Sequence, residues 1–498
     1  MAVWLYGVLL LLSVLFYLLY RKFHYWQQKD IRTWQVNPLM GNLRQLDTMH
    51  HTDILAELYQ RYKGKECVAG FYIFTQPVAV LLDLDLIKAA LVKDFNEFSD
   101  RFAYQNNKDL TADNLFFWES QKWRSLRGKF STIFTPAKIK YMYNTINAAA
   151  MQMKDSVATC LEKSDILNIT DLSGRFTTDV IANCILGCES HSLKFQPSEF
   201  HNIAPVTTGA TDFNIRWKLF VETYVHIIES MGIHVTFFPK ELEQFYMNLL
   251  KNNFIEREKM NIRRQDLLDL LVDLRKLQDE NGNPILTHNE IASNLFLFFA
   301  AGYESSANTI CNSLWELARH PELQDHVRHE IQSVLEEHNN VLSYEACMKM
   351  TYLDQIISET NRLYPIFSYL ERLTTVDYKI PNTKQVLEKG TRILIPIRSI
   401  HYDPDIYPNP EEFRPERFDP AEVKQRHPQS YLAFGDGPRN CIGIRLGRLQ
   451  VTTAMVAMLS NYKFSLCDRT IERAEYSKHT FALKNLHDIW LRVEKLEG

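Results

Sequence analysis

The chain has 498 residues, a formal net charge of -4 at pH 7, and 46% hydrophobic and 23% charged residues. These proportions are typical of a folded globular protein and exclude a disordered chain, a collagen-like repeat and a multi-span transporter. The nearly balanced charge gives no global field that would attract nucleic acid, so we expect no DNA or RNA partner. Glycine (17) and proline (18) are scarce, which favours helices over many short strands and turns.

Residues 2–20 are predicted to form one membrane-spanning helix. The segment carries no charge, and a helix of this length spans about 29 Å, close to the ~30 Å apolar core of a bilayer. A signal peptide would have basic residues before the apolar run and a small-residue cleavage site after it. Arg21 and Lys22 follow the run, so the positive-inside rule predicts that the rest of the chain is cytosolic. The alternative, a buried core helix, would show a polar face.

Three parts are expected along the chain: an anchor at 1–20, a connector at 21–45 and one large domain at 46–498. Because disulfides rarely persist in the cytosol, the cysteines are expected to be thiols. Cys184 and Cys188 are predicted to pack in the core, since no further ligands lie at zinc-site spacing. Asn168, in the sequon Asn-Ile-Thr, is expected to stay unglycosylated.

The elements that follow the connector indicate a mainly α fold with a minor β sheet (α+β). Residues 72–82 are rich in β-branched and aromatic side chains, which predicts a small sheet near the N-terminus. Helical periodicity dominates from 85 to 319. The longest helix is predicted to open at Thr287, with Glu290 completing a capping box, and to end at His320 before a proline. Its middle is apolar nearly all round, which predicts a helix through the centre of a large domain.

A glycine-rich segment near the C-terminus surrounds one cysteine, Cys441. Four of the 17 glycines fall within residues 435–447. Glycine permits tight turns and close backbone approach, so the segment is predicted to hold Cys441 rigidly. A helix predicted at 442–460 would place the thiol at a helix N-terminus, which lowers a thiol pKa and favours an anionic sulfur available to a metal. An inert buried cysteine is the alternative, but it leaves Phe434 and Arg439 unexplained.

Residues 434–443, FGDGPRNCIG, resemble the haem-binding loop of the cytochrome P-450 superfamily, whose pattern is Phe, Gly, x, Gly, x, Arg, x, Cys, x, Gly. Further signatures follow the family's order along the chain: WRSLR at 123–127, AGYES at 301–305, the pair Glu359 and Arg362, and PERF at 415–418. FSDR at 98–101 and RLTTVDYKIP from Arg372 are most similar to insect microsomal members, of the family-six-like type. The resemblance implies the P-450 fold preceded by one transmembrane helix.

The resemblance implies that haem b (iron protoporphyrin IX) is the cofactor, with Cys441 as its metal ligand. A cysteine thiolate pushes electron density onto haem iron and favours cleavage of a bound O–O bond. The cofactor-binding positions, several of which match arginines that hold haem propionates in the family, are Cys441, Arg101, Trp123, Arg127, Arg372, Phe434 and Arg439. Arginine suits carboxylates because its donors form a fixed fork.

The resemblance also implies catalytic roles on the central helix. Ala301 and Gly302 are expected to leave room for O2 and substrate, and Glu304 and Ser305 match the family's acid and threonine. Serine departs from the family pattern: its hydroxyl can donate a proton, but without the β-methyl its rotamer is less restricted. Alternatively, Ser305 bonds only to a carbonyl one turn earlier. In the family, Glu359, Arg362 and Arg417 form a buried charge network with a structural role.

Electrons are expected to come from a separate NADPH-cytochrome reductase, because no G-x-G-x-x-G fingerprint for a flavin or nicotinamide is present. The reductase is expected to dock on a basic patch made of Lys122, Arg124, Lys129, Lys138, Lys140, Arg445 and Arg448. The other partners are O2, membrane lipid and a lipophilic small-molecule substrate. The resemblance places the protein in the endoplasmic reticulum (microsomal) membrane, with the catalytic domain on the cytosolic side.

The predicted function is that of a haem-thiolate monooxygenase, which inserts one atom of O2 into a lipophilic substrate during metabolism of insect hormones (ecdysteroid-like) or breakdown of xenobiotics and insecticides. Two alternatives stay open: a turnover-deficient haem protein that binds ligands, and a reductase-independent isomerase or dehydratase. The residues expected to line the substrate pocket are Phe116, Phe117, Phe213, Phe237, Phe238, Phe298, Phe299, 366–369 and Phe481.

Overall fold

The structure is a computed structural model, which describes residues 2–46, 48–102, 112–195, 198–207, 215–233, 235–236, 238–260, 263–264, 266–477 and 482–496. The α-helices are, in chain order, α1 (Ala2–Phe23), α2 (Tyr25–Gln28), α3 (His51–Tyr62), α4 (Leu84–Lys88), α5 (Ser120–Ser131), α6 (Pro136–Leu161), α7 (Ile169–Ile181), α8 (Glu199–Thr207), α9 (Ile215–Ser230), α10 (Lys240–Met260), α11 (Leu267–Lys276), α12 (His288–Arg319), α13 (Pro321–Glu337), α14 (Tyr344–Cys347), α15 (Thr351–Leu363), α16 (Ile397–His401), α17 (Pro420–Gln425) and α18 (Ile444–Leu459).

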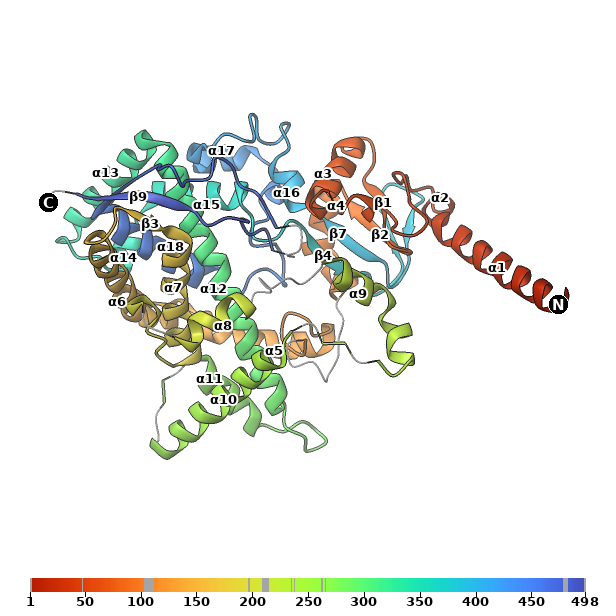
Figure 1. Ribbon diagram of the computed structural model, residues 1–498, viewed down its shortest axis with the longest axis horizontal. Coiled ribbons are helices and arrows are strands. Elements are labelled where there is room, and N and C mark those ends of the chain that lie inside the picture. The colour runs from red at the N-terminus through yellow and green to blue at the C-terminus, as the bar shows by residue number, and fades with distance from the viewer. Residues whose placement is uncertain are drawn as a thin grey trace.

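The strands confirm the predicted minor β component. They are β1 (Val68–Ile73), β2 (Gln76–Leu81), β3 (Ile166–Asn168), β4 (Leu370–Leu373), β5 (Tyr378–Lys379), β6 (Val386–Leu387), β7 (Arg392–Ile395), β8 (Tyr462–Ser465) and β9 (Trp490–Lys495). The largest sheet has the order β1-β2-β7-β4 and lies between the N-terminal helices and the helical body (Figure 1). In it, β2 pairs with β7 in parallel, while β1 pairs with β2 and β4 with β7 in antiparallel register.

The central helix α12 forms as predicted. Its N-cap Thr287 accepts a hydrogen bond from the backbone N–H of Glu290, and the Glu290 carboxylate accepts one from the backbone N–H of Thr287. This capping box satisfies backbone donors that a helix start leaves without partners. The helix packs along α7 and crosses α18 and α15 (Figure 1). Trp315, near the end of the helix, is fully buried. The helix therefore runs through the core, as its apolar sequence predicted.

The N-terminal helix α1 projects away from the rest of the molecule (Figure 1). Its segment Trp4–Phe23 has a mean hydropathy of 1.7, is not buried, and is long and apolar enough to cross a membrane. The chain that follows is tied to the first sheet through Trp26. The Trp26 ring lies against Gly70, where a Cβ atom would come within 2.4 Å of the ring, and its indole N–H donates to the carbonyl of Phe71 at 3.2 Å. Part of the predicted connector is thus packed against β1.

The buried cysteines behave as packing residues. Cys184 belongs to the main hydrophobic core, and Cys188 packs against it. Burial raises the pKa of both thiols to about 12, so they are protonated at neutral pH. Within the described residues no group of three potential metal-ligating side chains occurs. The prediction that this pair packs in the core is confirmed.

Candidate functional site

One cavity of about 530 Å³ lies between α12, the glycine-rich loop and the β4–β7 edge of the first sheet. All the sequence-predicted site residues line it, namely Cys441, Arg101, Trp123, Arg127, Arg372, Phe434, Arg439, Glu304 and Ser305. These residues are up to 340 positions apart in the sequence. The fold therefore brings the predicted binding and catalytic positions to the wall of a single cavity.

The glycine-rich loop reaches its shape through left-handed backbone at two positions. Gly435 has φ +67° and Gly437 has φ +71°, a region that favours glycine. At Gly437 a Cβ atom would lie 1.8 Å from the carbonyl oxygen of Leu91, so only glycine fits against this segment. The loop closes with a hydrogen bond from the backbone N–H of Cys441 to the carbonyl of Phe434 at 2.9 Å. These constraints hold Cys441 at the cavity wall.

The sequence predicted a lowered pKa and an anionic sulfur for Cys441, and the structure corrects this prediction. Cys441 lies three residues before α18, and its accessible surface faces the cavity. Burial raises the pKa of this thiol, while a backbone N–H bond from Gly443 and the charges of Arg127 and Arg101 act in the opposite direction. Desolvation is the larger effect, so the helix terminus alone does not produce a thiolate. A bound metal ion would itself displace the thiol proton.

Four guanidinium groups converge on the cavity beside Cys441: Arg101, Arg127, Arg372 and Arg439. Burial lowers the pKa of each of them. Arg372 adds to the shift at Arg101 and Arg439 by charge repulsion, and the pKa reaches about 10 at Arg372 and about 9 at Arg439. Such a cluster of like charges is unfavourable unless an anion binds to it.

The hydrogen bonds of these arginines go mainly to backbone carbonyls. Arg439 donates to the carbonyl of Trp118 at 2.7 Å, and Arg127 to that of Asn440 at 2.9 Å. The Nε of Arg372, and Nε and Nη1 of Arg439, have no hydrogen-bond partner among the described residues. An acid near the cluster, Asp100, is 3.9 Å from Arg439. The donor set therefore has unused capacity for carboxylates, which fits the two propionates of a haem.

Aromatic rings support two of the guanidinium groups. Arg439 lies over the ring of Trp123 at 4.4 Å, and Arg101 over the ring of Phe116 at 3.8 Å. Such stacking holds a guanidinium plane in place without using its N–H donors. Trp123 is itself buried on α5, one helical turn before Arg127. A residue pair at this spacing lies on one helix face, which explains why both reach the cavity.

On α12, Ala301 and Gly302 both line the cavity, as expected, and Gly302 also has a packing function that the sequence did not indicate. A Cβ atom on Gly302 would come within 2.5 Å of the Ile181 side chain from α7. Gly302 thus permits close packing of α7 on α12, in addition to its place beside Ala301 in the cavity wall. Glu304 lies at the cavity wall with one carboxylate oxygen 4.0 Å from the ammonium of Lys484.

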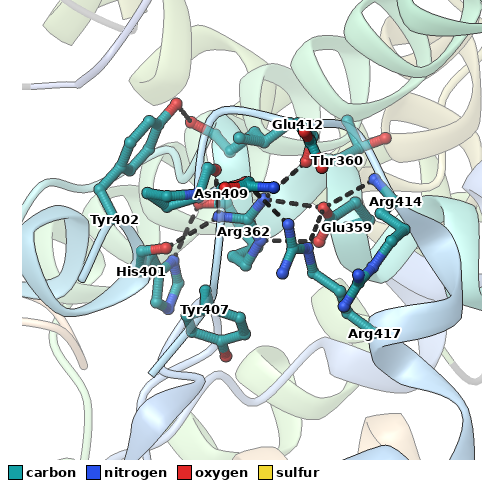
Figure 2. Close-up of polar contacts among 12 residues, drawn as sticks. Glu359, Thr360, Arg362, His401, Tyr402, Tyr407, Asn409, Glu412, Arg414 and Arg417 are labelled. Carbon is teal, nitrogen blue, oxygen red and sulfur yellow. Dashed lines mark hydrogen bonds and ion pairs between the residues drawn. The ribbon is translucent and has the colours of Figure 1, made fainter. Parts of the chain in front are cut away.

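The network predicted from Glu359, Arg362 and Arg417 is present (Figure 2). Arg362 binds the Glu359 carboxylate through Nε at 2.7 Å and through Nη2 at 2.7 Å, and Arg417 lies 3.2 Å from the same carboxylate. All three side chains are at most 1% exposed. Arg362 also donates to the carbonyls of His401 and Pro410, both at 2.8 Å. The network joins α15 to the chain that precedes the glycine-rich loop.

The cavity differs in part from the predicted substrate pocket. Phe116, Phe117, Phe238 and Phe298 line it, together with Ile366, Phe367 and Tyr369. Phe299 does not: it is fully buried and stacks on Tyr303 in the core. The prediction for Phe299 was wrong because both faces of an all-apolar helix look alike in sequence. Phe213, Phe237 and Phe481 lie outside the described residues.

Sequence reasoning missed a set of charged residues in the same cavity wall: Lys218, Glu222, Glu371 and Arg392. It also missed Thr309, one turn beyond Ser305 on α12, and Asn361 on α15, which line the cavity and are joined by a hydrogen bond of 2.9 Å. These residues belong to no motif, and only the fold brings them together. Glu371 and Arg392 lie on the paired strands β4 and β7, and β propensity does not indicate which strands pair.

Comparisons with known proteins agree with the geometry of this cavity. The family model described as cytochrome P-450 matches residues 32–491. Probable cytochrome P-450 6a14 of Drosophila melanogaster is 39% identical over 490 residues, covering 95% of this chain and 96% of the relative. Cytochrome P-450 6A1 of Musca domestica is 38% identical over 501 residues, covering 99% and 98%. The chain therefore belongs to the cytochrome P-450 family and is a haem monooxygenase of the insect type.

Proposed function

We propose that the cavity holds haem b, with the Cys441 sulfur as the ligand of its iron and the arginine cluster binding the propionates. The observation that carries the proposal is the convergence of one cysteine and four arginines on the wall of the same cavity. Two of these arginines, Arg372 and Arg439, have buried donors without a hydrogen-bond partner among the described residues. When bound, the haem supplies activation of O2 at its iron. Phe434 lines the cavity, and its carbonyl accepts a hydrogen bond from the Cys441 backbone, so its ring would shield the sulfur from water.

The residues of α12 would serve proton delivery and access to the reacting centre. Ala301 leaves space at the cavity wall, and Ser305 can accept a hydrogen bond from a water molecule there, since its own proton is held by the Ala301 carbonyl. Glu304, partly exposed and near Lys484, is placed to exchange protons with solvent. We assign Ser305 the role of positioning that water and Glu304 the role of supplying the proton.

The substrate would be a lipophilic small molecule, because the wall of the cavity is mainly aromatic and aliphatic. Hormone-like (ecdysteroid-like) compounds and xenobiotics, including insecticides, both meet this description. Turnover of hormone-like compounds and of insecticides by the same preparation, followed by identification of the products, would distinguish the two classes.

Electrons would come from NADPH-cytochrome reductase at the endoplasmic reticulum membrane. Of the basic patch predicted to bind it, Lys122 pairs with Glu290, Lys140 with Glu345, and Arg448 with Asp354 at 2.8 Å. The paired cations contribute less attraction to an acidic partner, so Arg124, Lys129 and Arg445 are the stronger candidates. We propose that residues 1–20 anchor the chain, that 21–45 connect, and that 46–498 form one catalytic domain facing the cytosol.

NADPH consumption by the full chain with purified reductase, with and without lipophilic compounds, tests the proposed function. A monooxygenase consumes NADPH and forms an oxygenated product. Haem binding without NADPH consumption favours a ligand-binding protein, and product formation from a peroxide without reductase favours an isomerase or dehydratase. Protease added outside sealed microsomes should remove the catalytic domain and leave Asn168 without a glycan; a protected domain would reverse the orientation.

A further inference from the structure

Four charged side chains occupy one part of the cavity wall, where α9 meets the first sheet. Lys218 and Glu222 come from α9, Glu371 from β4 and Arg392 from β7. The guanidinium of Arg392 donates through Nε to the Glu371 carboxylate at 2.9 Å and through Nη2 to the Glu222 carboxylate at 3.3 Å. The Lys218 ammonium is 4.0 Å from the other Glu222 oxygen. We call these four residues the polar cluster.

Arg392 has a donor that the polar cluster does not use. Its side chain is 1% exposed, and Nη1 has no hydrogen-bond partner among the described residues. Leaving a buried donor without a partner is unfavourable, and most such groups in proteins are satisfied. The ring of Phe102, another residue of the cavity wall, covers the guanidinium face at 4.4 Å, so an acceptor must approach in the guanidinium plane.

A purely structural tie between α9 and the sheet does not account for the placement of these charges. Burial raises the pKa of Glu222, which shows that the site disfavours its charge, while Lys218 and Arg392 oppose this shift. Apolar side chains would join α9 to the sheet without this desolvation cost. The cluster instead presents charged side chains to a cavity whose wall, apart from Glu304 and the arginines beside Cys441, is mainly apolar. In such cavities a few well-placed polar groups commonly orient a ligand.

We propose that the polar cluster binds the polar end of the substrate, a neutral oxygen acceptor such as a ketone or ester carbonyl, through the free N–H of Arg392. The cluster has two cations and two anions, so a neutral acceptor keeps its charge balanced, whereas a carboxylate would lie close to Glu222 and Glu371. The hydrocarbon part of the substrate then extends along the aromatic wall towards Ala301. This inference rests on the proposed monooxygenase function and narrows its substrate class.

The inference predicts a preference among ligands of equal length. An apolar cavity without a polar anchor binds a ketone more weakly than an alkane, because the carbonyl loses its hydrogen bonds with water. A hydrogen bond from a charged donor reverses this order and strengthens binding by about tenfold or more. We therefore expect the full-length haem protein to bind 2-decanone at least about tenfold more tightly than decane or decanoate.

The change in the absorption spectrum of the haem iron on ligand binding measures these three affinities. The double variant R392M/E371Q removes one cation and one anion, so the net charge of the cluster stays the same. It should lose the preference for 2-decanone while keeping its affinity for decane. Phe238→Leu is the matched control in the apolar wall, and it should weaken binding of decane and 2-decanone alike.

Should the double variant fail to fold, the wild-type protein still tests the inference, through its affinities and through the position of oxygenation. Holding the carbonyl at the sheet directs oxygenation to the half of 2-decanone remote from it. Equal affinities for decane and 2-decanone, a preference for decanoate, or oxygen inserted along the whole chain would each overturn the inference. A wild-type protein without thiolate-type haem would instead contradict the proposed function. Failure of the substrate inference and failure of the proposed function therefore give different results.

Discussion

The hydroxyl of Ser305 donates a hydrogen bond to the backbone carbonyl of Ala301, 2.7 Å away and one turn earlier in α12. The hydroxyl proton is therefore held within the helix, and only the oxygen lone pairs are available to a molecule in the cavity. This is the alternative that the sequence left open for Ser305. It favours a role in which Ser305 holds a water molecule rather than one in which it donates directly to bound dioxygen.

The first prediction concerns this hydroxyl. Ser305→Ala removes the acceptor and should lower the product formed per NADPH by roughly tenfold, with more peroxide released, since proton delivery is typically worth ~10²–10⁴-fold and water replaces part of it. Ser305→Thr should improve this ratio, because β-branching restricts χ1 in a helix. The measurement is product, peroxide and NADPH in the same reaction. Unchanged coupling in Ser305→Ala would show that Ser305 takes no part in proton delivery.

The second prediction concerns the charge network of Figure 2. Glu359→Ala leaves Arg362 and Arg417 buried without their carboxylate and should lower the free energy of unfolding by ~3–5 kcal/mol. The control is Asp273→Ala, which breaks an exposed pair with Arg263 and should change stability by less than about 0.5 kcal/mol. Denaturant unfolding of the full chain in detergent gives both values. Equal effects of the two substitutions would contradict the structural role of the network.

The third prediction follows from His401, which burial and the charge of Arg362 hold at a pKa of about 3. The backbone N–H of Leu432 donates to Nε2 at 3.0 Å, so Nδ1 carries the proton and donates to the Arg362 carbonyl at 3.0 Å. The unfolded state binds a proton below pH ~6.5, whereas the folded state does not until about pH 3. The contribution of His401 therefore lowers the free energy of unfolding by ~1.4 kcal/mol for each pH unit between about 6.5 and about 3.

Unfolding midpoints at pH 7.5 and 5.5, compared between the wild type and His401→Gln, measure this contribution. The variant cannot take up the proton, so its stability should depend less on pH over this range, even where its stability at pH 7.5 is lower. An identical pH dependence in the two proteins would show that His401 does not control the acid sensitivity.

The fourth prediction compares two glycines of the same loop with similar left-handed φ values. Gly437→Ala would place a methyl group 1.8 Å from the Leu91 carbonyl oxygen, so the loop must move and haem retention should be lost. At Gly435 the nearest atom to an added Cβ is 3.8 Å away, so Gly435→Ala should cost only the ~1–2 kcal/mol of the backbone conformation. Haem content after purification and unfolding midpoints test this difference. Equal haem loss in both variants would contradict the contact with Leu91.

Features with local causes were predictable from the sequence. The capping box at Thr287 and Glu290 depends on two side chains three residues apart, and the structure confirms both the start of α12 and its burial. The glycine-rich loop was recognisable because its conformation needs glycine at Gly435 and Gly437, whatever surrounds it.

Features that depend on distant contacts could not be predicted in this way. The ion pair of Arg392 with Glu222 joins residues 170 positions apart, and no pattern in either segment indicates the other. The same holds for Gly302, whose small size serves the approach of Ile181. The position of Cys441 near a helix start was predictable, but its pKa depends mainly on desolvation, which is a property of the assembled cavity.

The fifth prediction tests the assignment of Cys441, on which the account of the site depends. Cys441→Ser leaves the loop nearly unchanged in shape but replaces the soft sulfur by a weakly basic hydroxyl. The absorption spectrum of the reduced, carbon monoxide-bound protein reports the axial ligand directly, because a thiolate shifts the main band of haem. The wild type is expected to show the thiolate-type spectrum and Cys441→Ser to lack it; a thiolate-type spectrum in the variant would contradict the account.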